Sequence, residues 1–151
     1  MSDLPDNLYP MDIRPRALEG EIAAPASAKK VRILLGARQT GKSTLLRKLA
    51  GADAILFNLQ ERRTRLELER DPAILTQQLR ADPRPQLQVL IDEIQKAPAL
   101  LDEVQCLFDE APGRYRFILT GSSARRLKRS SANLLPGRSH LFFLSPLVLS
   151  E

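Results

Sequence analysis

The segment GARQTGKS at residues 36–43 has the residue types and the spacing of a phosphate-binding loop. Four residues separate Gly36 from Gly41, and Lys42 and Ser43 follow directly. In this pattern the main-chain N–H groups surround a chain of phosphates, the lysine reaches the β- and γ-phosphates, and the serine hydroxyl binds Mg²⁺. We therefore expect the segment to bind a nucleoside triphosphate, with ATP and Mg²⁺ as the ligands.

The residues expected to contact the nucleotide are those of the loop and the first residue after it. They are Gly36, Ala37, Arg38, Gln39, Thr40, Gly41, Lys42, Ser43 and Thr44. The side chain of Arg38 could face either phosphate or solvent. The alternative for the whole segment is an ordinary glycine-containing turn between a strand and a helix.

The runs on both sides of the loop fit the elements that such a loop needs. Residues 31–35, VRILL, are apolar and partly β-branched and stop at Gly36, which predicts a buried strand. Residues 44–50 predict a helix, because their three leucines fall on one face and a glycine follows. The loop therefore precedes the amino end of a helix, whose positive end attracts phosphate.

A second group of candidate residues follows the apolar run LQVLI at residues 87–91, where Asp92 and Glu93 stand together. Ligands of a parallel sheet bind beyond the carboxyl ends of its strands, so we expect this pair beside the loop. Asp92 would hold Mg²⁺ through a water molecule, together with Ser43. Glu93 would orient and activate a water for attack on the γ-phosphate. The alternative is that one of the two acids only caps a turn.

The second acid bears on the type of reaction. A kinase that acts on a small molecule must exclude water from the γ-phosphate, and a GTPase needs a guanine-reading N-K-x-D run, which the sequence lacks. ATP hydrolysis is therefore the favoured reaction. Two rivals stay open. One is a module that binds ATP as a switch without hydrolysing it, and the other is a nucleic-acid-associated module that uses the basic run at residues 125–129.

Strands and helices alternate along the chain, which predicts an α/β fold with a mostly parallel sheet covered on both faces. We expect strands at residues 31–35, 54–59, 87–91, 116–120 and 140–144. We expect helices at residues 16–24, 44–50, 72–80, 100–110 and 123–135. Residues 1–28 are interpreted as an N-terminal arm with a short helix, and residues 29–151 as a single nucleotide-binding core.

The composition is that of a globular protein, because 43% of the 151 residues are hydrophobic and 27% are charged, with a net charge of +5. The first residues lack a basic or long apolar segment, and the apolar stretch at 141–149 is too short to cross a bilayer. Cys106 is the only cysteine and cannot form an intrachain disulfide. We expect the Cys106 side chain on the core side of its helix. We also expect the protein to lie in the cytoplasm and to have no membrane partner.

The loop and the acidic pair together resemble those of the P-loop ATPases of the AAA superfamily, and most of all a prokaryotic group of AAA-type ATP-binding proteins. The resemblance runs from about residue 12 to the end of the chain. Its matching segments are LLGARQTGKSTLL at 34–46, LIDEIQKAP at 90–98, RFILTGSSAR at 116–125, NLLPGR at 133–138 and LSPL at 144–147. It implies a three-layer α/β/α sandwich with the five strands in the order 5-1-4-3-2.

The resemblance also implies roles for two further residues. Thr120 matches the polar position at the end of the fourth strand that helps to place the attacking water, with Ser122 as the second choice. Arg138 matches the place where AAA proteins carry an arginine that stabilises charge on the γ-phosphate of a neighbouring subunit, which implies a homo-oligomer. The alternatives are a strand-end hydroxyl that binds the main chain and a plain surface arginine.

The family pattern continues past residue 151 into a C-terminal region, often with a restriction-endonuclease-like domain. We therefore expect this chain to hold the N-terminal ATPase core alone. Since the C-terminal region closes over the nucleotide in such proteins, we expect hydrolysis to depend on it more than nucleotide binding does.

Overall fold

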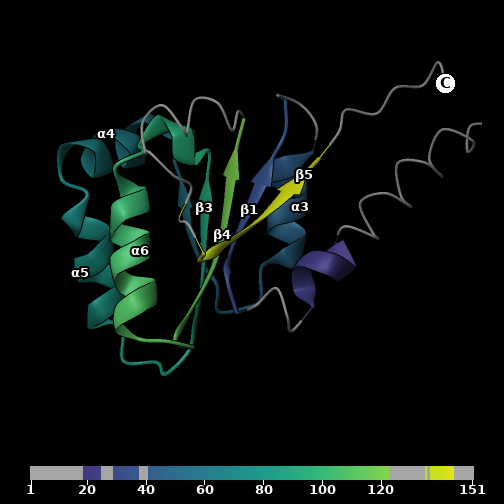
Figure 1. The fold of residues 1–151 in the computed structure, drawn as a ribbon. Coiled ribbons are helices and arrows are strands. Elements are labelled where there is room, and N and C mark those ends of the chain that lie inside the picture. The colour runs from purple at the N-terminus through teal and green to yellow at the C-terminus, as the bar shows by residue number, and fades with distance from the viewer. Residues whose placement is uncertain (1–18, 25–28, 38–40, 123–134, 136, 145–151) are drawn as a thin grey trace, which may run out of the picture.

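The computed structural model describes residues 19–24, 29–37, 41–122, 135 and 137–144, which form a five-stranded sheet between two layers of helices (Figure 1). The strands are β1 (Val31–Leu35), β2 (Ile55–Asn58), β3 (Leu87–Asp92), β4 (Tyr115–Gly121) and β5 (Ser139–Phe143). They lie in the order β2-β3-β4-β1-β5, and all paired strands are parallel. The expected fold class and strand order are therefore confirmed.

Burial across the sheet explains why its strands read as apolar runs. Every residue of β1 is buried, and β3 and β4 each have one residue that is not. Strands that are covered on both faces must be apolar on both faces, so their sequences do not alternate. The edge strands β2 and β5 are more open, since Leu56 is 43% exposed and Phe143 is 65% exposed.

One face of the sheet is covered by α3 (Lys42–Leu49) and by a helical segment at residues 19–23 (Figure 1). The segment carries Ile22, which is 0% exposed and packs with leucines of α3. The buried Arg32 guanidinium of β1 donates a 3.0 Å hydrogen bond to the Ile22 carbonyl oxygen. Part of the expected arm at residues 1–28 thus packs against the core, and the domain boundary after it stays a prediction.

The other face is covered by α4 (Arg62–Arg70), α5 (Ala73–Ala81) and α6 (Leu100–Glu110) (Figure 1). Their buried side chains pack with those of β1, β3 and β4 in a single apolar cluster. The helical members of this cluster include Leu68, Leu75, Leu79, Leu100, Leu101, Val104 and Leu107. The core thus lies on both sides of the central strands, whose carboxyl ends carry the candidate site.

Two differences from the expected elements concern α4 and a short 3₁₀ helix, η1 (Ile94–Lys96). The sequence predicts no helix after β2, because α4 buries only Leu68 and has no apolar stripe to reveal it. The expected helix at 123–135 falls almost wholly outside the described residues. Among the described helices, none is long enough and apolar enough to cross a membrane.

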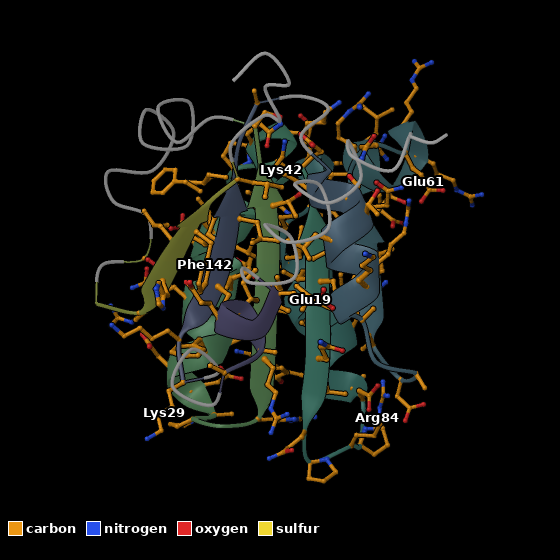
Figure 2. The ribbon with its side chains drawn as sticks, turned by 90° about the vertical axis from the view of Figure 1, so that its right-hand side faces the viewer. Glu19, Lys29, Lys42, Glu61, Arg84 and Phe142 are labelled. Atoms are coloured by element: carbon orange, nitrogen blue, oxygen red, sulfur yellow. The ribbon has the colours of Figure 1, made fainter. Side chains whose placement is uncertain are left out.

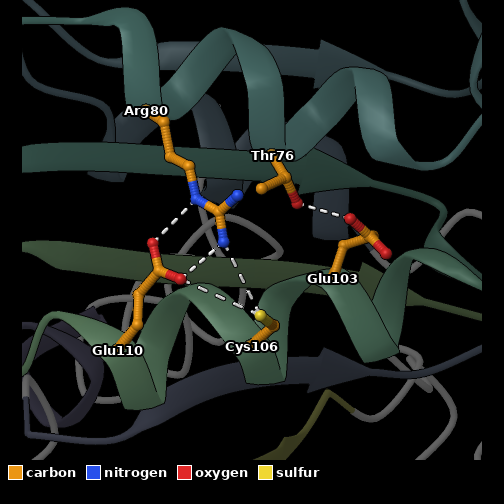
Figure 3. A network of polar contacts seen from close by, with 5 residues as sticks. All are labelled: Thr76, Arg80, Glu103, Cys106 and Glu110. Carbon is orange, nitrogen blue, oxygen red and sulfur yellow. Dashed lines mark hydrogen bonds and ion pairs between the residues drawn. The ribbon is translucent and has the colours of Figure 1, made fainter.

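The expectation for Cys106 is wrong, because its side chain is exposed. Successive helical residues are about 100° apart, so Cys106 lies about 200° from the buried Val104, on the opposite side of α6. There its sulfur lies 3.9 Å from a guanidinium nitrogen of Arg80 and 3.9 Å from a carboxylate oxygen of Glu110 (Figure 3). Cys106 therefore belongs to a polar contact between α5 and α6.

Candidate functional site

The carboxyl ends of β1, β3 and β4 lie side by side and carry most of the candidate residues. Leu35 at the end of β1 pairs with Gly121 of β4, and β4 also pairs with β3. A pocket of about 390 Å³ opens at this end of the sheet. Its lining residues are Gly41, Lys42, Ser43, Thr44, Gln60, Glu93 and Lys96. The end of the loop and Glu93 of the acidic pair therefore meet at one pocket, as the parallel arrangement predicts.

The described parts of the loop have the geometry of a strand-to-helix turn. The Gly36 N–H donates a 3.2 Å hydrogen bond to the Gly121 carbonyl oxygen, which joins the start of the loop to β4. Gly41 has φ 87° and immediately precedes α3, and its carbonyl oxygen accepts a 2.9 Å hydrogen bond from the Leu45 N–H. The amino end of α3 thus borders the pocket. Arg38, Gln39 and Thr40 lie outside the described residues.

Lys42 brings a cation to the loop. It is 4% exposed, and its Nζ atom donates hydrogen bonds to the carbonyl oxygens of Gly36 at 2.9 Å and Ala37 at 2.8 Å. Burial lowers the pKa of Lys42, and the nearby carboxylates of Glu93 and Asp92 oppose that effect. The ammonium group is therefore held against the loop, at the edge of the pocket.

Asp92 lies at the centre of a hydrogen-bonded group that joins three elements. Its Oδ2 atom accepts a 2.9 Å hydrogen bond from the Ser43 hydroxyl of α3, and its Oδ1 atom accepts one from the Thr120 hydroxyl of β4. Asp92 is 2% exposed and Thr120 is 0% exposed. Both carboxylate oxygens thus have protein partners, which is how a buried carboxylate is normally satisfied.

The oxygens of this group suit Mg²⁺. The ion takes oxygen ligands and usually keeps several water molecules, so it is bound through one or two carboxylates together with substrate phosphates. Ser43 Oγ and Asp92 Oδ2 are 2.9 Å apart. The part of the chain that the structure describes has no cluster of three or more His, Cys, Asp and Glu residues that could hold a metal. Ser43 could hold such an ion directly and Asp92 through a water molecule, with phosphate and water in the remaining positions.

Glu93 turns away from the strand direction directly after Asp92. It has φ 63° and ψ 52°, a left-handed conformation that costs a residue with a side chain about 1–2 kcal/mol. Its main-chain N–H donates a 2.9 Å hydrogen bond to Thr120 Oγ1. Its carboxylate Oε1 accepts a 2.8 Å hydrogen bond from the Ser122 hydroxyl and another from the Gln95 amide. The turn is thus supported by β4, and Glu93 lines the pocket.

Both polar residues that were considered at the end of β4 contact the acidic pair, in different ways. Thr120 binds the Asp92 carboxylate and the Glu93 main chain, whereas Ser122 binds the Glu93 carboxylate. The structure places Thr120 between the loop and the acidic pair. Its effect on an attacking water stays a prediction.

Gln60 is a site residue that the sequence analysis missed. Its Nε2 atom donates hydrogen bonds to Ser43 Oγ at 3.1 Å and to Asp92 Oδ2 at 2.9 Å. It lies two residues after β2, in a segment that matches no motif, and only the pairing of β2 with β3 brings it to the pocket. Lys96 also lines the pocket; it lies in the matching segment at 90–98, but the sequence analysis gave it no role.

Arg138 does not lie near the other candidate residues of its own chain. It precedes β5, and its carbonyl oxygen accepts a 2.7 Å hydrogen bond from the N–H of Val31, where β1 begins. The loop lies at the opposite end of β1, and Figure 2 shows Lys42 there and Lys29 near the start of β1. The Arg138 Nε atom donates to both carboxylate oxygens of Asp109, at 2.7 and 2.9 Å. Its action in a neighbouring subunit stays a prediction.

Comparison with known proteins agrees with this geometry. A family described as "AAA domain" matches residues 28–151. A DNA polymerase III, gamma subunit-related protein from Thermotoga maritima has a similar structure, with a TM-score of 0.53 and 11% sequence identity. The match covers 90% of this chain and 47% of that chain, so this chain spans about half the length of that protein. At this identity the likeness concerns the fold alone. No curated protein matches the chain in sequence.

The family match takes in every candidate site residue, from Gly36 to Arg138. The sheet order, the strand-to-helix turn at Gly41 and the acidic pair after β3 agree with it. The chain therefore belongs to the AAA domain family and contains an AAA-type P-loop ATPase core.

Proposed function

We propose that this protein binds ATP with Mg²⁺ and hydrolyses it. The observation that carries the proposal is that Lys42, Ser43 and Glu93 line one pocket at the carboxyl end of the sheet, where Asp92 is hydrogen-bonded to Ser43. Membership of the AAA domain family supports nucleotide binding and ATPase activity in general. Hydrolysis by this chain, its Mg²⁺ requirement and the individual residue roles belong to the proposal.

The loop and α3 would bind the nucleotide. Main-chain N–H groups of residues 38–43 and the amino end of α3 would face the phosphates, because both present positive partial charge. The Lys42 ammonium would exchange its carbonyl partners for the β- and γ-phosphate oxygens, which are stronger acceptors. Ser43 and Asp92 would hold Mg²⁺, which neutralises charge on the phosphates when it is bound.

Glu93 would act on the attacking water. A carboxylate within hydrogen-bond reach of a water can accept its proton as the bond to phosphorus forms. The two hydrogen bonds from Ser122 and Gln95 end on Oε1, so they restrict how the carboxylate can rotate. Thr120 would keep Asp92 and the Glu93 main chain at a fixed separation, which supports the roles of both acids.

Arg138 would act between subunits of a homo-oligomer. Its position at the far end of β1 supports an action on a neighbouring chain rather than on its own nucleotide. Its ion pair with Asp109 is partly exposed, with side-chain exposures of 35% and 44%, and such pairs contribute little to stability. Release of Asp109 would therefore cost little when the arginine engages phosphate.

A second candidate function is an ATP-binding switch that does not hydrolyse the nucleotide. The observation that favours it is the engagement of the Glu93 carboxylate by Ser122 and Gln95, which would have to leave room for a water. The basic run at residues 125–129, on which a nucleic-acid-associated module depends, lies outside the described residues, so that third function stays a prediction.

The variant Glu93→Gln distinguishes ATP hydrolysis from a switch that binds ATP without hydrolysing it. If the protein hydrolyses ATP, the wild type releases phosphate. Glu93→Gln then binds ATP as tightly but releases phosphate at least about a hundredfold more slowly, which is the lower end of what a general base contributes. The matched control is Glu67→Gln, which alters an exposed glutamate of α4. If neither the wild type nor Glu67→Gln releases phosphate above the Glu93→Gln rate, although all three bind ATP, the switch is the correct function.

A further inference from the structure

Gln60 contacts both side chains that would hold the metal ion. Its Nε2 atom lies 3.1 Å from Ser43 Oγ and 2.9 Å from Asp92 Oδ2, and these two oxygens lie 2.9 Å from each other. The amide nitrogen therefore completes a triangle with the two oxygens. Gln60 also lines the pocket in which the nucleotide is proposed to bind.

The main chain around Gln60 is fixed on both sides. Leu59 is 0% exposed, and its N–H donates a 3.1 Å hydrogen bond to the Asp92 carbonyl oxygen. The Asn58 side-chain oxygen accepts a 3.0 Å hydrogen bond from the Gln60 N–H, and the Asn58 carbonyl oxygen accepts one of 3.1 Å from the Glu61 N–H. Gln60 itself is exposed, so its side chain can rotate while its main chain stays in place.

The direction of the hydrogen bonds follows from the chemistry of the partners. An ionised carboxylate only accepts hydrogen bonds, so the NH₂ group of Gln60 must face Asp92. A water molecule on a metal ion has the opposite need, because it donates and requires an acceptor. Rotation of the Gln60 amide by half a turn replaces Nε2 by Oε1, which is such an acceptor. The same side chain can therefore serve the site with and without the ion.

We propose that Gln60 is a positioning residue of the Mg²⁺ site. Its amide nitrogen holds Ser43 and Asp92 together in the absence of the ion, and its amide oxygen accepts hydrogen bonds from water on the ion when Mg²⁺ and nucleotide bind. Residues that orient metal ligands and metal-bound water in this way change metal affinity by about 10–100-fold. The inference rests on the proposed Mg-ATP site, and it adds a third protein group to Ser43 and Asp92.

Two substitutions at this position have opposite expected effects. Gln60→Leu keeps most of the side-chain volume but removes both the donor and the acceptor. Gln60→Glu keeps an acceptor and adds a negative charge beside Asp92, which attracts a divalent cation and repels the carboxylate when no cation is present. Since the side chain is exposed, neither change removes a core contact.

The test is a Mg²⁺ titration of ADP binding, followed with a fluorescent ADP analogue on the wild type and each variant. A second readout is Mn²⁺ binding to the ADP complex by electron paramagnetic resonance. ADP is used because neither measurement then depends on hydrolysis. Gln78→Leu, at an exposed glutamine of α5, is the matched control, and thermal melting checks that each variant is folded.

We expect Gln60→Leu to raise the Mg²⁺ concentration at half-saturation about tenfold and to leave ADP binding in EDTA unchanged. Gln60→Glu should lower the Mg²⁺ concentration at half-saturation below the wild-type value, and Gln78→Leu should leave that concentration unchanged. If Gln60→Leu and Gln60→Glu both match the wild type, Gln60 does not position the ion. If the wild type itself shows no Mg²⁺-dependent binding of ADP, the proposed Mg-ATP site is wrong. The two failures are thus distinct.

Discussion

The Ser122 hydroxyl donates a 2.8 Å hydrogen bond to the Glu93 carboxylate, and this contact joins the residue after β4 to the residue after β3. The two residues are 29 positions apart in the chain and meet because β3 and β4 are neighbours in the sheet. The parallel order of the sheet thus determines which hydroxyl can orient the acid. The family resemblance favours Thr120 for a site role, and the geometry gives Ser122 a separate contact of its own.

The variant Ser122→Ala tests whether this hydrogen bond orients Glu93 for catalysis. A hydrogen bond to a charged group contributes about 1.5–3 kcal/mol, so loss of its orienting effect should lower kcat about tenfold or more. The affinity for ATP should stay unchanged, because Ser122 does not line the pocket. The measurements are steady-state phosphate release at saturating Mg-ATP and equilibrium binding of ATP.

Ser122→Thr is the control, because it keeps the hydroxyl and should retain most of the activity. A Ser122→Ala enzyme that turns over as fast as the wild type, or faster, would show that the hydrogen bond does not hold Glu93 in a productive position.

The elements around the loop could be predicted because their signals are local. The run at residues 31–35 is mostly apolar, because β1 is buried on both faces. The glycines and the lysine that follow it have the spacing of a phosphate-binding loop, so they identify the loop directly. The strand order came from the family resemblance and is confirmed. Asp92 was found because an acid that ends an apolar strand is conspicuous in the sequence.

The remaining features depend on tertiary contacts that leave no local pattern. Gln60 reaches the site only because β2 pairs with β3, and the left-handed conformation of Glu93 is unusual for a residue with a side chain. The helix α4 escaped prediction because it buries a single leucine, Leu68. The error at Cys106 was avoidable, because helical periodicity alone places it opposite Val104.

The conformation of Gly41 leads to a prediction that compares two glycines. Neither Gly41 nor Gly20 has an atom within 4 Å of the position that a Cβ would take, but Gly41 has φ 87° whereas Gly20 is helical. Gly41→Ala should therefore lower the free energy of unfolding by about 1–2 kcal/mol through backbone strain. Gly20→Ala should raise it by about 1 kcal/mol through helix propensity.

Urea unfolding of both variants measures these two changes. Gly41→Ala should also weaken ATP binding, because relief of the strain would move the end of the loop. An equal effect of the two substitutions on stability would contradict the assigned conformation of Gly41.

The polar contacts between α5 and α6 lead to a prediction on stability (Figure 3). The Thr76 hydroxyl is part of a buried residue, 5% exposed, and donates to the Glu103 carboxylate. Thr76→Val keeps the shape and removes the bond, so it should lower the free energy of unfolding by about 1–3 kcal/mol. Arg80→Gln removes an exposed ion pair with Glu110 and should cost less, because exposed ion pairs contribute little to stability.

Chemical denaturation of both variants at neutral pH gives the two values directly. The loss of stability should be larger for Thr76→Val than for Arg80→Gln. A larger loss for Arg80→Gln than for Thr76→Val would show that the exposed pair, and not the buried hydroxyl, holds the two helices together.

Lys42, at the start of α3, is proposed to bind nucleotide phosphates in the pocket. The most direct measurement is the equilibrium affinity for Mg-ATP of the wild type, Lys42→Ala and Lys48→Ala, with thermal melting to confirm folding. Lys48 is an exposed lysine on the same helix, so its removal changes the net charge equally. We predict that Lys42→Ala binds about thirtyfold or more weakly, since a buried charge contact contributes about 2–5 kcal/mol, and that Lys48→Ala binds like the wild type. Equal affinity of all three folded proteins for Mg-ATP would show that Lys42 does not bind the nucleotide phosphates.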